Sequence, residues 1–272
     1  MRNGKKQDRT SALFIILVLV VCVIMPSGLV EAGAQSTTIT VLYNNVSGRT
    51  DCITDWGFAC LVKGNEKTLL FDTGEDGSIL LHNMKRMNVD PESIDVVVLS
   101  HIHSDHAGGL TEFLKHKNDV VVYVPASFPS HFKHATKRKG VTIEEVSKAR
   151  QLCKDVYTTG EMGLGIQEQT LIVKTSKGMA IITGCAHPGI VNIVKAAKEQ
   201  HKDDVYMIIG GFHLSSMSPG EIKHIVSRLQ ELGVRKVAPS HCTGAQARDL
   251  FRDAWGKNFI EGGVGVIIEL PY

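Results

Sequence analysis

The 272-residue sequence is poor in aromatic residues and has no long basic segment. Only 6% of its residues are Phe, Trp or Tyr, and the formal net charge is +2. Nucleic-acid grooves need a sustained concentration of Lys and Arg, so these features argue against a nucleic-acid partner. No repeat period or low-complexity linker follows Gln35. With 43% hydrophobic residues, the chain is typical of one globular domain with a sizeable core.

Cysteine is scarce as well, and its count excludes a disulfide scaffold. One of the six, Cys22, lies in an apolar N-terminal run, and the others are Cys52, Cys60, Cys153, Cys185 and Cys242. Five cysteines cannot all pair within one chain. Cys52 and Cys60 are compatible with a single bridge, and the alternative is that both are small apolar packing residues.

The N-terminus has the composition of a targeting segment. A basic stretch precedes an apolar run from Ala12 to Met25, and Ala32-Gly33-Ala34 follows. This pattern predicts a signal peptide over residues 1–34, cleaved before Gln35, and an exported domain over residues 35–272. The apolar run has 14 residues, fewer than the roughly 20 that span a bilayer. We therefore expect no stable membrane insertion after cleavage, and a membrane tether only if the segment is uncleaved.

Short β-branched or aromatic runs alternate with helical periodicity along the domain. Strands are expected at 38–43, 57–62, 68–71, 94–99, 120–124, 171–173, 179–183, 205–209, 236–238 and 265–270. Helices are expected at 78–87, 190–198, 219–232 and 245–254. The third helix starts with a capping box formed by Ser218 and Glu221. Strands in both halves, each followed by helices, predict two sheets packed face to face with helices outside.

The segment richest in chemistry is His101-Ile102-His103-Ser104-Asp105-His106. It follows the apolar strand expected at 94–99 and precedes Gly108-Gly109, where the backbone can bend tightly. His101 and His103 are two residues apart, so both side chains point the same way while the chain is extended. Three imidazoles and a carboxylate are costly to bury without a partner, and a metal ion supplies one. The spacing therefore predicts a metal site.

Three more histidines follow expected strands beside glycine or proline. They are His187, His213 and His241. Any one of them could be a structural histidine, but loops at strand ends can converge on one site, and the shared context favours a functional role. Asp72 ends another strand, and it is either a turn residue or a carboxylate that orients the histidine loop.

These residues together resemble a known family. His101-x-His103-x-Asp105-His106, preceded by Asp72-Thr73-Gly74 and followed by His187 and His241, resembles the pattern of the metallo-β-lactamase fold superfamily. The segments 184–189, 210–214, 241–244 and 263–265 resemble the branch labelled dihydropterin ribofuranosylaminobenzene phosphate synthase-like. The resemblance implies an α/β fold, a four-layer αβ/βα sandwich of metallo-β-lactamase type.

The resemblance also implies a ligand set for two divalent ions. One ion is assigned to His101, His103 and His187, and the other to Asp105, His106 and His241. Many members carry a bridging aspartate after the strand matching 205–209, where this chain reads Gly210-Gly211-Phe212-His213. How the ions are bridged is therefore open, and His213 is a ligand, a substrate contact or a proton donor. Cys185 and Cys242 are interpreted as packing residues, because the pattern gives metal binding to the histidines.

The expected chemistry is hydrolysis. Imidazoles with one carboxylate suit Zn²⁺, with Mn²⁺ or Fe as alternatives. Such a site lowers the pKa of bound water from about 15.7 to about 7, which makes metal-bound hydroxide the expected nucleophile. We expect Asp105 to bind metal and orient this hydroxide, and His213 to serve the leaving group or the developing oxyanion. No G-x-S-x-G nucleophile elbow is present.

The substrate is expected to be a small anionic molecule. The basic and aromatic segment 127–139 lies where this fold often places a substrate-covering insertion, although a solvated loop is the alternative. A basic lid favours a phosphate ester or an anionic lactone. The alternatives are the pterin-related synthase of the branch label, whose substrate would be cytosolic, and a non-catalytic metal-binding protein. Redox chemistry is disfavoured, because diiron relatives carry glutamate at the position of His103. The oligomeric state stays open.

Overall fold

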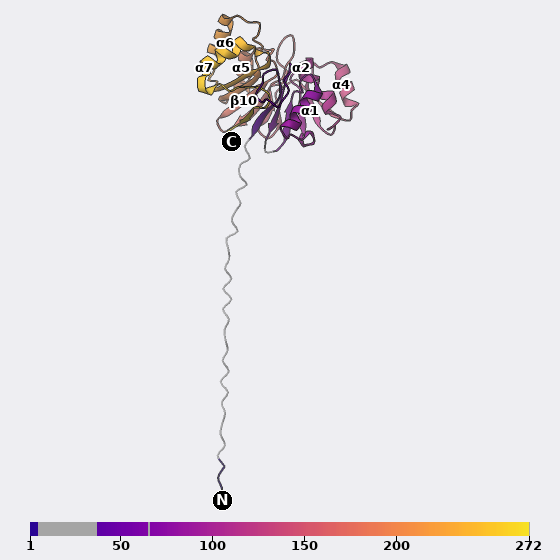
Figure 1. Cartoon of the computed structure of the whole chain (residues 1–272), viewed down its shortest axis with the longest axis vertical. Coiled ribbons are helices and arrows are strands. Elements are labelled where there is room, and N and C mark those ends of the chain that lie inside the picture. Colours follow the sequence, from indigo (N-terminus) through magenta and orange to yellow (C-terminus); the bar gives the residue numbers. More distant parts are fainter. Residues whose placement is uncertain (5–36, 65, 272) are drawn as a thin grey trace. The chain divides into compact units, whose positions relative to one another are not determined.

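A computed structural model describes residues 1–4, 37–64 and 66–271. The expected signal peptide lies almost entirely outside these residues. The domain that follows contains two β-sheets with helices at their outer faces (Figure 1). Within the described part of the chain, no helix is both long enough and apolar enough to cross a bilayer.

The first sheet has seven strands. In spatial order they are β13 (Ile267–Glu269), β1 (Thr38–Asn44), β2 (Phe58–Lys63), β3 (Thr68–Phe71), β4 (Val96–Val98), β5 (Val121–Pro125) and β6 (Thr142–Val146). The strands from β13 to β3 pair antiparallel, and those from β3 to β6 pair parallel. The carboxyl ends of β3 and β4 consequently lie at the same edge.

The second sheet has six strands. In spatial order they are β12 (Lys236–Ser240), β11 (Val205–Gly211), β10 (Gly178–Thr183), β9 (Leu171–Thr175), β8 (Val156–Thr158) and β7 (Arg150–Cys153). The strands β10, β11 and β12 pair parallel, and the remaining pairs are antiparallel. The three parallel strands bring the segments after residues 183, 211 and 240 to one edge.

Helices cover the outer face of each sheet. They are α1 (Gly77–Arg86), α2 (Ser104–Ala107), α3 (Leu110–Phe113), α4 (Ser130–Lys137), α5 (Ile190–His201), α6 (Pro219–Glu231) and α7 (Ala245–Trp255). Figure 1 shows α1 and α4 on the side of the first sheet, and α5, α6 and α7 on the side of the second. The predicted capping box of α6 is present, with Ser218 and Glu221 each bonded to the other's backbone N–H.

Three separate hydrophobic clusters define four layers. One cluster lies between the sheets and contains Phe71 of β3 and Ile182 of β10. A second joins the outer face of the first sheet to α1 and α3, through residues such as Leu80. A third joins the outer face of the second sheet to α5, α6 and α7. Because burial of apolar area drives this layering, the predicted four-layer αβ/βα sandwich is confirmed.

The expected strands and helices are present, with ends that shift by a few residues. The strands β6, β7 and β8 were not predicted, because polar and partly exposed residues interrupt their alternation. The segment 127–139, for which the sequence suggests a substrate-covering insertion or a solvated loop, contains α4. Phe128 and Phe132 pack on the first sheet while the basic side chains of α4 line a surface pocket. Cys52 and Cys60 are both free, which excludes the bridge and agrees with the alternative that both are packing residues.

Candidate metal centre

The candidate ligands lie on loops at the carboxyl ends of strands from both sheets. β4 leads into His101, β10 leads into Cys185 and His187, and β12 leads into His241. His213 follows β11 by two residues. The sequence places these strands far apart, but the parallel pairing aligns their ends and so gathers the side chains into one region.

The ligand atoms form three groups, and within each group all atoms lie within 4.8 Å of one another. The groups are His101 with His103 and His187, then Asp105 with His106, Cys185 and His241, and finally Cys185 with His187 and His213. The fold thus brings together the six predicted ligands in the two sets that the resemblance implies. It also places Cys185, interpreted from sequence as a packing residue, among them.

His101 is held in one tautomer by its neighbours. The Ser100 hydroxyl donates to Asp72 Oδ2 at 2.7 Å, so it accepts from His101 Nδ1–H at 2.9 Å. This leaves the lone pair of His101 Nε2 facing His103 Nδ1 at 3.1 Å. Burial and the neighbouring imidazoles lower the pKa of His101 far below its usual value. The imidazole is therefore neutral, as a metal ligand must be.

Asp72 orients the His106 ring of the second ligand group. Its Oδ2 accepts from His106 Nδ1 at 2.8 Å, and its Oδ1 accepts from the Ser100 backbone N–H at 2.6 Å. Burial opposes the charged form of His106, but Asp72 raises the pKa of this histidine overall. The contact fixes Nδ1 as the protonated atom and turns Nε2 toward the cluster. Asp72 thus has the orienting role that the sequence offered as one of two alternatives.

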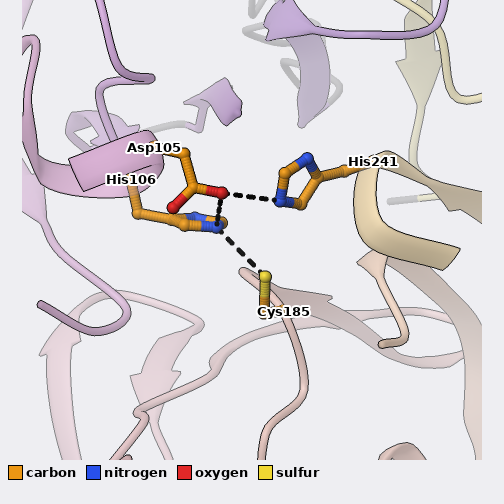
Figure 2. A group of neighbouring side chains, drawn as sticks. All are labelled: Asp105, His106, Cys185 and His241. Atoms are coloured by element: carbon orange, nitrogen blue, oxygen red, sulfur yellow. Dashed lines mark hydrogen bonds and ion pairs between the residues drawn. The ribbon is translucent and has the colours of Figure 1, made fainter. Parts of the chain in front are cut away.

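Four side chains converge around one point in the second group, as Figure 2 shows. His106 Nε2 lies 3.2 Å from Cys185 Sγ and 3.5 Å from Asp105 Oδ2. The same carboxylate oxygen lies 3.2 Å from His241 Nε2. Burial alone would raise the pKa of Asp105, but its hydrogen bond with His241 and the nearby imidazoles lower it to about 2. Asp105 is therefore an anionic ligand candidate at neutral pH.

The residues fit divalent metal ions. Donor atoms around a tetrahedral Zn²⁺ are roughly 3.3–3.6 Å apart, close to the spacings of 3.1–3.5 Å seen here. His187 Nε2 is buried and has no hydrogen-bond partner among the described residues. Buried polar atoms are normally paired, and a cation between the ligand groups would satisfy this nitrogen.

Glu168 is a positioning residue that the sequence analysis missed. Its Oε1 accepts the backbone N–H groups of residues 184, 185 and 186 at 3.0–3.1 Å, and its Oε2 accepts that of His187 at 2.8 Å. Burial raises the pKa of Glu168 to about 7, and the four donated hydrogen bonds oppose a further rise. One carboxylate therefore fixes the backbone of the loop that carries Cys185 and His187.

Strained backbone conformations gather at the centre. Asp72, Ala186, His213 and His241 have φ values between 50° and 59°, in the left-handed region. This region is unfavourable for residues other than glycine, and such strain persists only where the surroundings enforce it. Each of these residues is a candidate ligand, a chain neighbour of one, or a residue in contact with one. The strained backbone therefore helps to direct the ligand side chains toward the centre.

His213 and Cys242 lie beside the ligand groups. The His213 ring lies 4.5 Å from the ring of His187, measured between centroids. A hydrogen bond with Cys242 raises the pKa of His213 and so favours its protonated form. The pKa of Cys242 is lowered, chiefly because the Cys185 thiol donates to it. Trp56, which is 48% exposed, lies at the rim with its ring 4.8 Å from that of His241.

With this site and fold, the chain belongs to the metallo-β-lactamase superfamily. The model of the family described as the metallo-beta-lactamase superfamily matches residues 57–183. The chain is also similar to 7,8-dihydropterin-6-methyl-4-(beta-D-ribofuranosyl)-aminobenzene-5'-phosphate synthase from Methanocaldococcus jannaschii. The two are 31% identical over 251 residues, which cover 76% of this chain and 85% of that protein.

Solved structures agree with this assignment. A protein described as a metal-dependent hydrolase of the β-lactamase superfamily is 27% identical, with a TM-score of 0.73 over 87% of this chain and 100% of that one. A metallo-β-lactamase fold protein from Bacillus subtilis has a TM-score of 0.66 at 13% identity, covering 86% of this chain and 100% of that one. The second likeness shows the shared fold alone.

Proposed function

We propose that this chain is an exported metal-dependent hydrolase that binds two divalent ions, with Zn²⁺ expected, and cleaves a phosphate ester or another anionic ester or lactone. The observation that carries this proposal is the pair of adjacent ligand groups around His101 and His106. The buried Nε2 of His187, which has no partner among the described residues, supports it. The solved structure with 27% identity is described as a metal-dependent hydrolase.

A divalent ion held by these ligands supplies Lewis-acid chemistry, because it acidifies water and polarises a substrate oxygen. The chain's own residues would then orient the metal ions and the attacking water. His101 and His187, whose pKa values burial lowers, present neutral nitrogens beside His103 on one side, and Asp105 presents an anionic oxygen on the other. Asp105 Oδ2 lies between His106 and His241, where it can also accept a hydrogen bond from a nucleophilic water.

His213 is the proposed proton donor to the leaving group. Its side chain is exposed, and a hydrogen bond with Cys242 raises its pKa, which favours the protonated form. A general acid needs both access to substrate and a pKa near the working pH. The exposed Trp56 ring beside His241 offers an apolar surface for the organic part of a substrate.

A second candidate function is favoured by one specific observation. The 31% identity to the synthase from Methanocaldococcus jannaschii extends over most of both chains. A synthase of this kind would use the same metal ligands, but it would join two organic substrates rather than add water. A pterin-type substrate would be cytosolic, so the synthase function conflicts with the export that we propose.

The test is a metal and substrate assay of the purified protein. We expect about two metal ions per chain and turnover of a phosphoester or lactone from a panel that also contains thioesters and β-lactams. A chelator should abolish this turnover, and His213→Gln should lower kcat roughly 10²–10⁴-fold, the usual contribution of general acid catalysis. The exposed His224→Gln is the matched control and should retain full activity.

The outcomes separate the alternatives. One ion per chain contradicts the two-ion proposal. Metal uptake without any turnover favours a non-catalytic metal-binding protein, and product formation only from paired pterin and aminobenzene substrates favours the synthase. Export is tested by sequencing the N-terminus of protein recovered from outside the cytoplasm. Recovery of the intact segment 1–34 in the cytoplasm contradicts it.

A further inference from the structure

We infer that the Cys185 thiolate is a metal ligand shared between the two ions, in place of the bridging carboxylate that many relatives carry. This inference rests on the metal occupancy of the proposed function. Cys185 is common to two of the three ligand groups, one with His106 and His241 and the other with His187 and His213. Since His187 also belongs to the group around His101, Cys185 is the residue through which the second ligand group adjoins the first.

The position of Cys185 is enforced by its surroundings. Its Sγ lies 3.2 Å from His106 Nε2, and the residue is only 3% exposed. The Glu168 carboxylate accepts the backbone N–H of Cys185 at 3.0 Å and those of its neighbours Gly184 and Ala186. Because hydrogen bonds fix the backbone of this loop, they direct the sulfur toward the ligand group. Side-chain packing alone does not set its position.

A carboxylate at the end of β11 has no room in this chain. A Cβ at Gly211 would lie 2.4 Å from the Gly184 carbonyl oxygen and 2.6 Å from Cys242 Sγ. A Cβ at Gly210 would lie 2.0 Å from the Thr183 carbonyl oxygen, and the φ of Gly210 is 119°. Both positions thus require glycine. The anionic ligand that β11 cannot supply is provided by the facing loop.

The chemistry of a thiolate suits this role. It carries one negative charge, as an aspartate does, and Zn–S bonds are about 2.3 Å long. Paired ions in hydrolytic sites are about 3.5–4 Å apart, so one sulfur can contact both. Metal binding displaces the thiol proton to solvent. A soft sulfur ligand also favours Zn²⁺ over the harder Mn²⁺.

Cys242 provides the matched comparison. It is 4% exposed and lies next to Cys185, with its Sγ 3.7 Å from the Cys185 carbonyl oxygen. Among the described residues it belongs to none of the three ligand groups. Its sulfur instead fills the space beside Gly211. Substitution of Cys242 should therefore change local packing without removing a ligand.

The test uses the full protein loaded with Co²⁺, whose bonds to sulfur give a charge-transfer band in the near ultraviolet. We expect this band in the wild type and in Cys242→Ser, and its loss in Cys185→Ser. The affinity for the second ion, measured by chelator competition, should fall at least ~10-fold in Cys185→Ser. X-ray absorption at the zinc edge of the wild-type protein should show a sulfur shell near 2.3 Å.

Cobalt uptake without the sulfur band in the wild type overturns the inference and leaves the proposed function intact. If the band persists in Cys185→Ser, or is lost only in Cys242→Ser, then Cys185 is not the sulfur ligand. Either result also overturns the inference. If Cys185→Ser fails to fold, the zinc-edge measurement decides, because a wild-type site without a sulfur shell excludes a thiolate ligand. Failure to take up any metal overturns the proposed function first.

Discussion

Two buried carboxylates, Asp72 and Glu168, orient the candidate ligands without belonging to the ligand groups. Asp72 turns the His106 imidazole, and Glu168 holds four consecutive backbone N–H groups. Both side chains are fully buried. Because a buried donor that loses its acceptor costs free energy, residues of this kind couple site geometry to the stability of the protein.

Glu168→Gln should weaken both stability and metal binding. The amide retains one acceptor oxygen and sets its NH₂ group against a backbone donor. We expect the free energy of unfolding to fall by about 1–3 kcal/mol and metal affinity to fall roughly 10–100-fold, measured by thermal unfolding and chelator competition. Glu161→Gln is the control, because its amide oxygen can still accept the one exposed hydrogen bond from the Ser127 N–H. Equal behaviour of the two variants would contradict the role of Glu168.

His201, at the end of α5, should contribute to acid sensitivity. Its Nε2 is buried without a partner among the described residues, and its ring lies 4.8 Å from that of Tyr157. Burial lowers the pKa of His201. The unfolded chain therefore takes up a proton at higher pH than the folded chain does, and the free energy of unfolding falls as pH drops below about 6.5.

The measurement compares Tm at about pH 7.5 and about pH 5.5. The loss of Tm on acidification should be a few degrees smaller in His201→Phe than in the wild type. His224→Phe, a substitution of an exposed histidine on α6, should keep the wild-type pH dependence. An unchanged slope in His201→Phe would show that its burial is not linked to protonation.

At the scale of elements, a glycine pair divides one helical segment into α2 and α3. Gly108 and Gly109 contact the loop that follows β3, where a Cβ at Gly109 would lie 2.2 Å from the Thr73 carbonyl oxygen. The Thr73 N–H in turn donates to the His106 carbonyl at 2.8 Å. The close approach of these two backbones therefore sets the distance between Asp72 and His106.

Gly109→Ala should destabilise the protein by forcing these backbones apart. Overpacking of this kind costs about 1–3 kcal/mol, which corresponds to a Tm decrease of roughly 2–12 °C. Gly165→Ala is the control, since a Cβ at that exposed position meets nothing within 4 Å. A Tm for Gly109→Ala equal to that of the control would show that the loops separate without cost.

At the scale of the whole domain, the centre joins the two sheets. Residues 101–106 follow a strand of the first sheet, whereas Cys185, His187 and His241 follow strands of the second. A cation bound by ligands from both sides binds the folded state and not the unfolded one. Such a ligand stabilises the fold by about 4 kcal/mol when present at 1,000 times its Kd.

Chelation should therefore lower the Tm of the protein, by roughly 8–16 °C per ion at that saturation. Calorimetry of the metal-loaded and chelated protein measures the shift. His101→Ala should show a smaller shift than the wild type, because one ligand group has lost a member. Identical Tm values before and after complete removal of metal would mean that the two sheets are held together without help from the centre.

The sequence predicted those parts of the molecule that depend on local pattern. The strands around 94–99 and 205–209, the capped helix α6 and the spacing from His101 to His106 all lie within short segments. Glu168 could not be found in this way, because its four partners lie 16 to 19 residues further along the chain. The only local signal was a glutamate just before an apolar strand, which is a weak one.

The place of Cys185 beside the candidate ligands was not predicted, for a related reason. Its neighbour His106 is 79 residues away, and a cysteine between two glycine-rich turns reads equally well as a packing residue. The strands β6 to β8 were missed because exposed polar residues hide their alternation. The contact between Cys185 and His106 and the pairing of strands β6 to β8 depend on which distant segments meet in the fold. A single sequence does not contain this information.

Glu168 holds the loop 184–187 by hydrogen bonds to its backbone, and this has a practical consequence for engineering. The carboxylate touches only backbone N–H groups, so the course of this loop is independent of the side chains at positions 185 and 187. Other donor groups can then be installed there while the surrounding scaffold is retained. A Cys185→Asp variant would present oxygen where sulfur now lies, and harder cations prefer oxygen. If Cys185 binds metal as proposed, this single substitution would shift the metal preference of the protein toward harder cations.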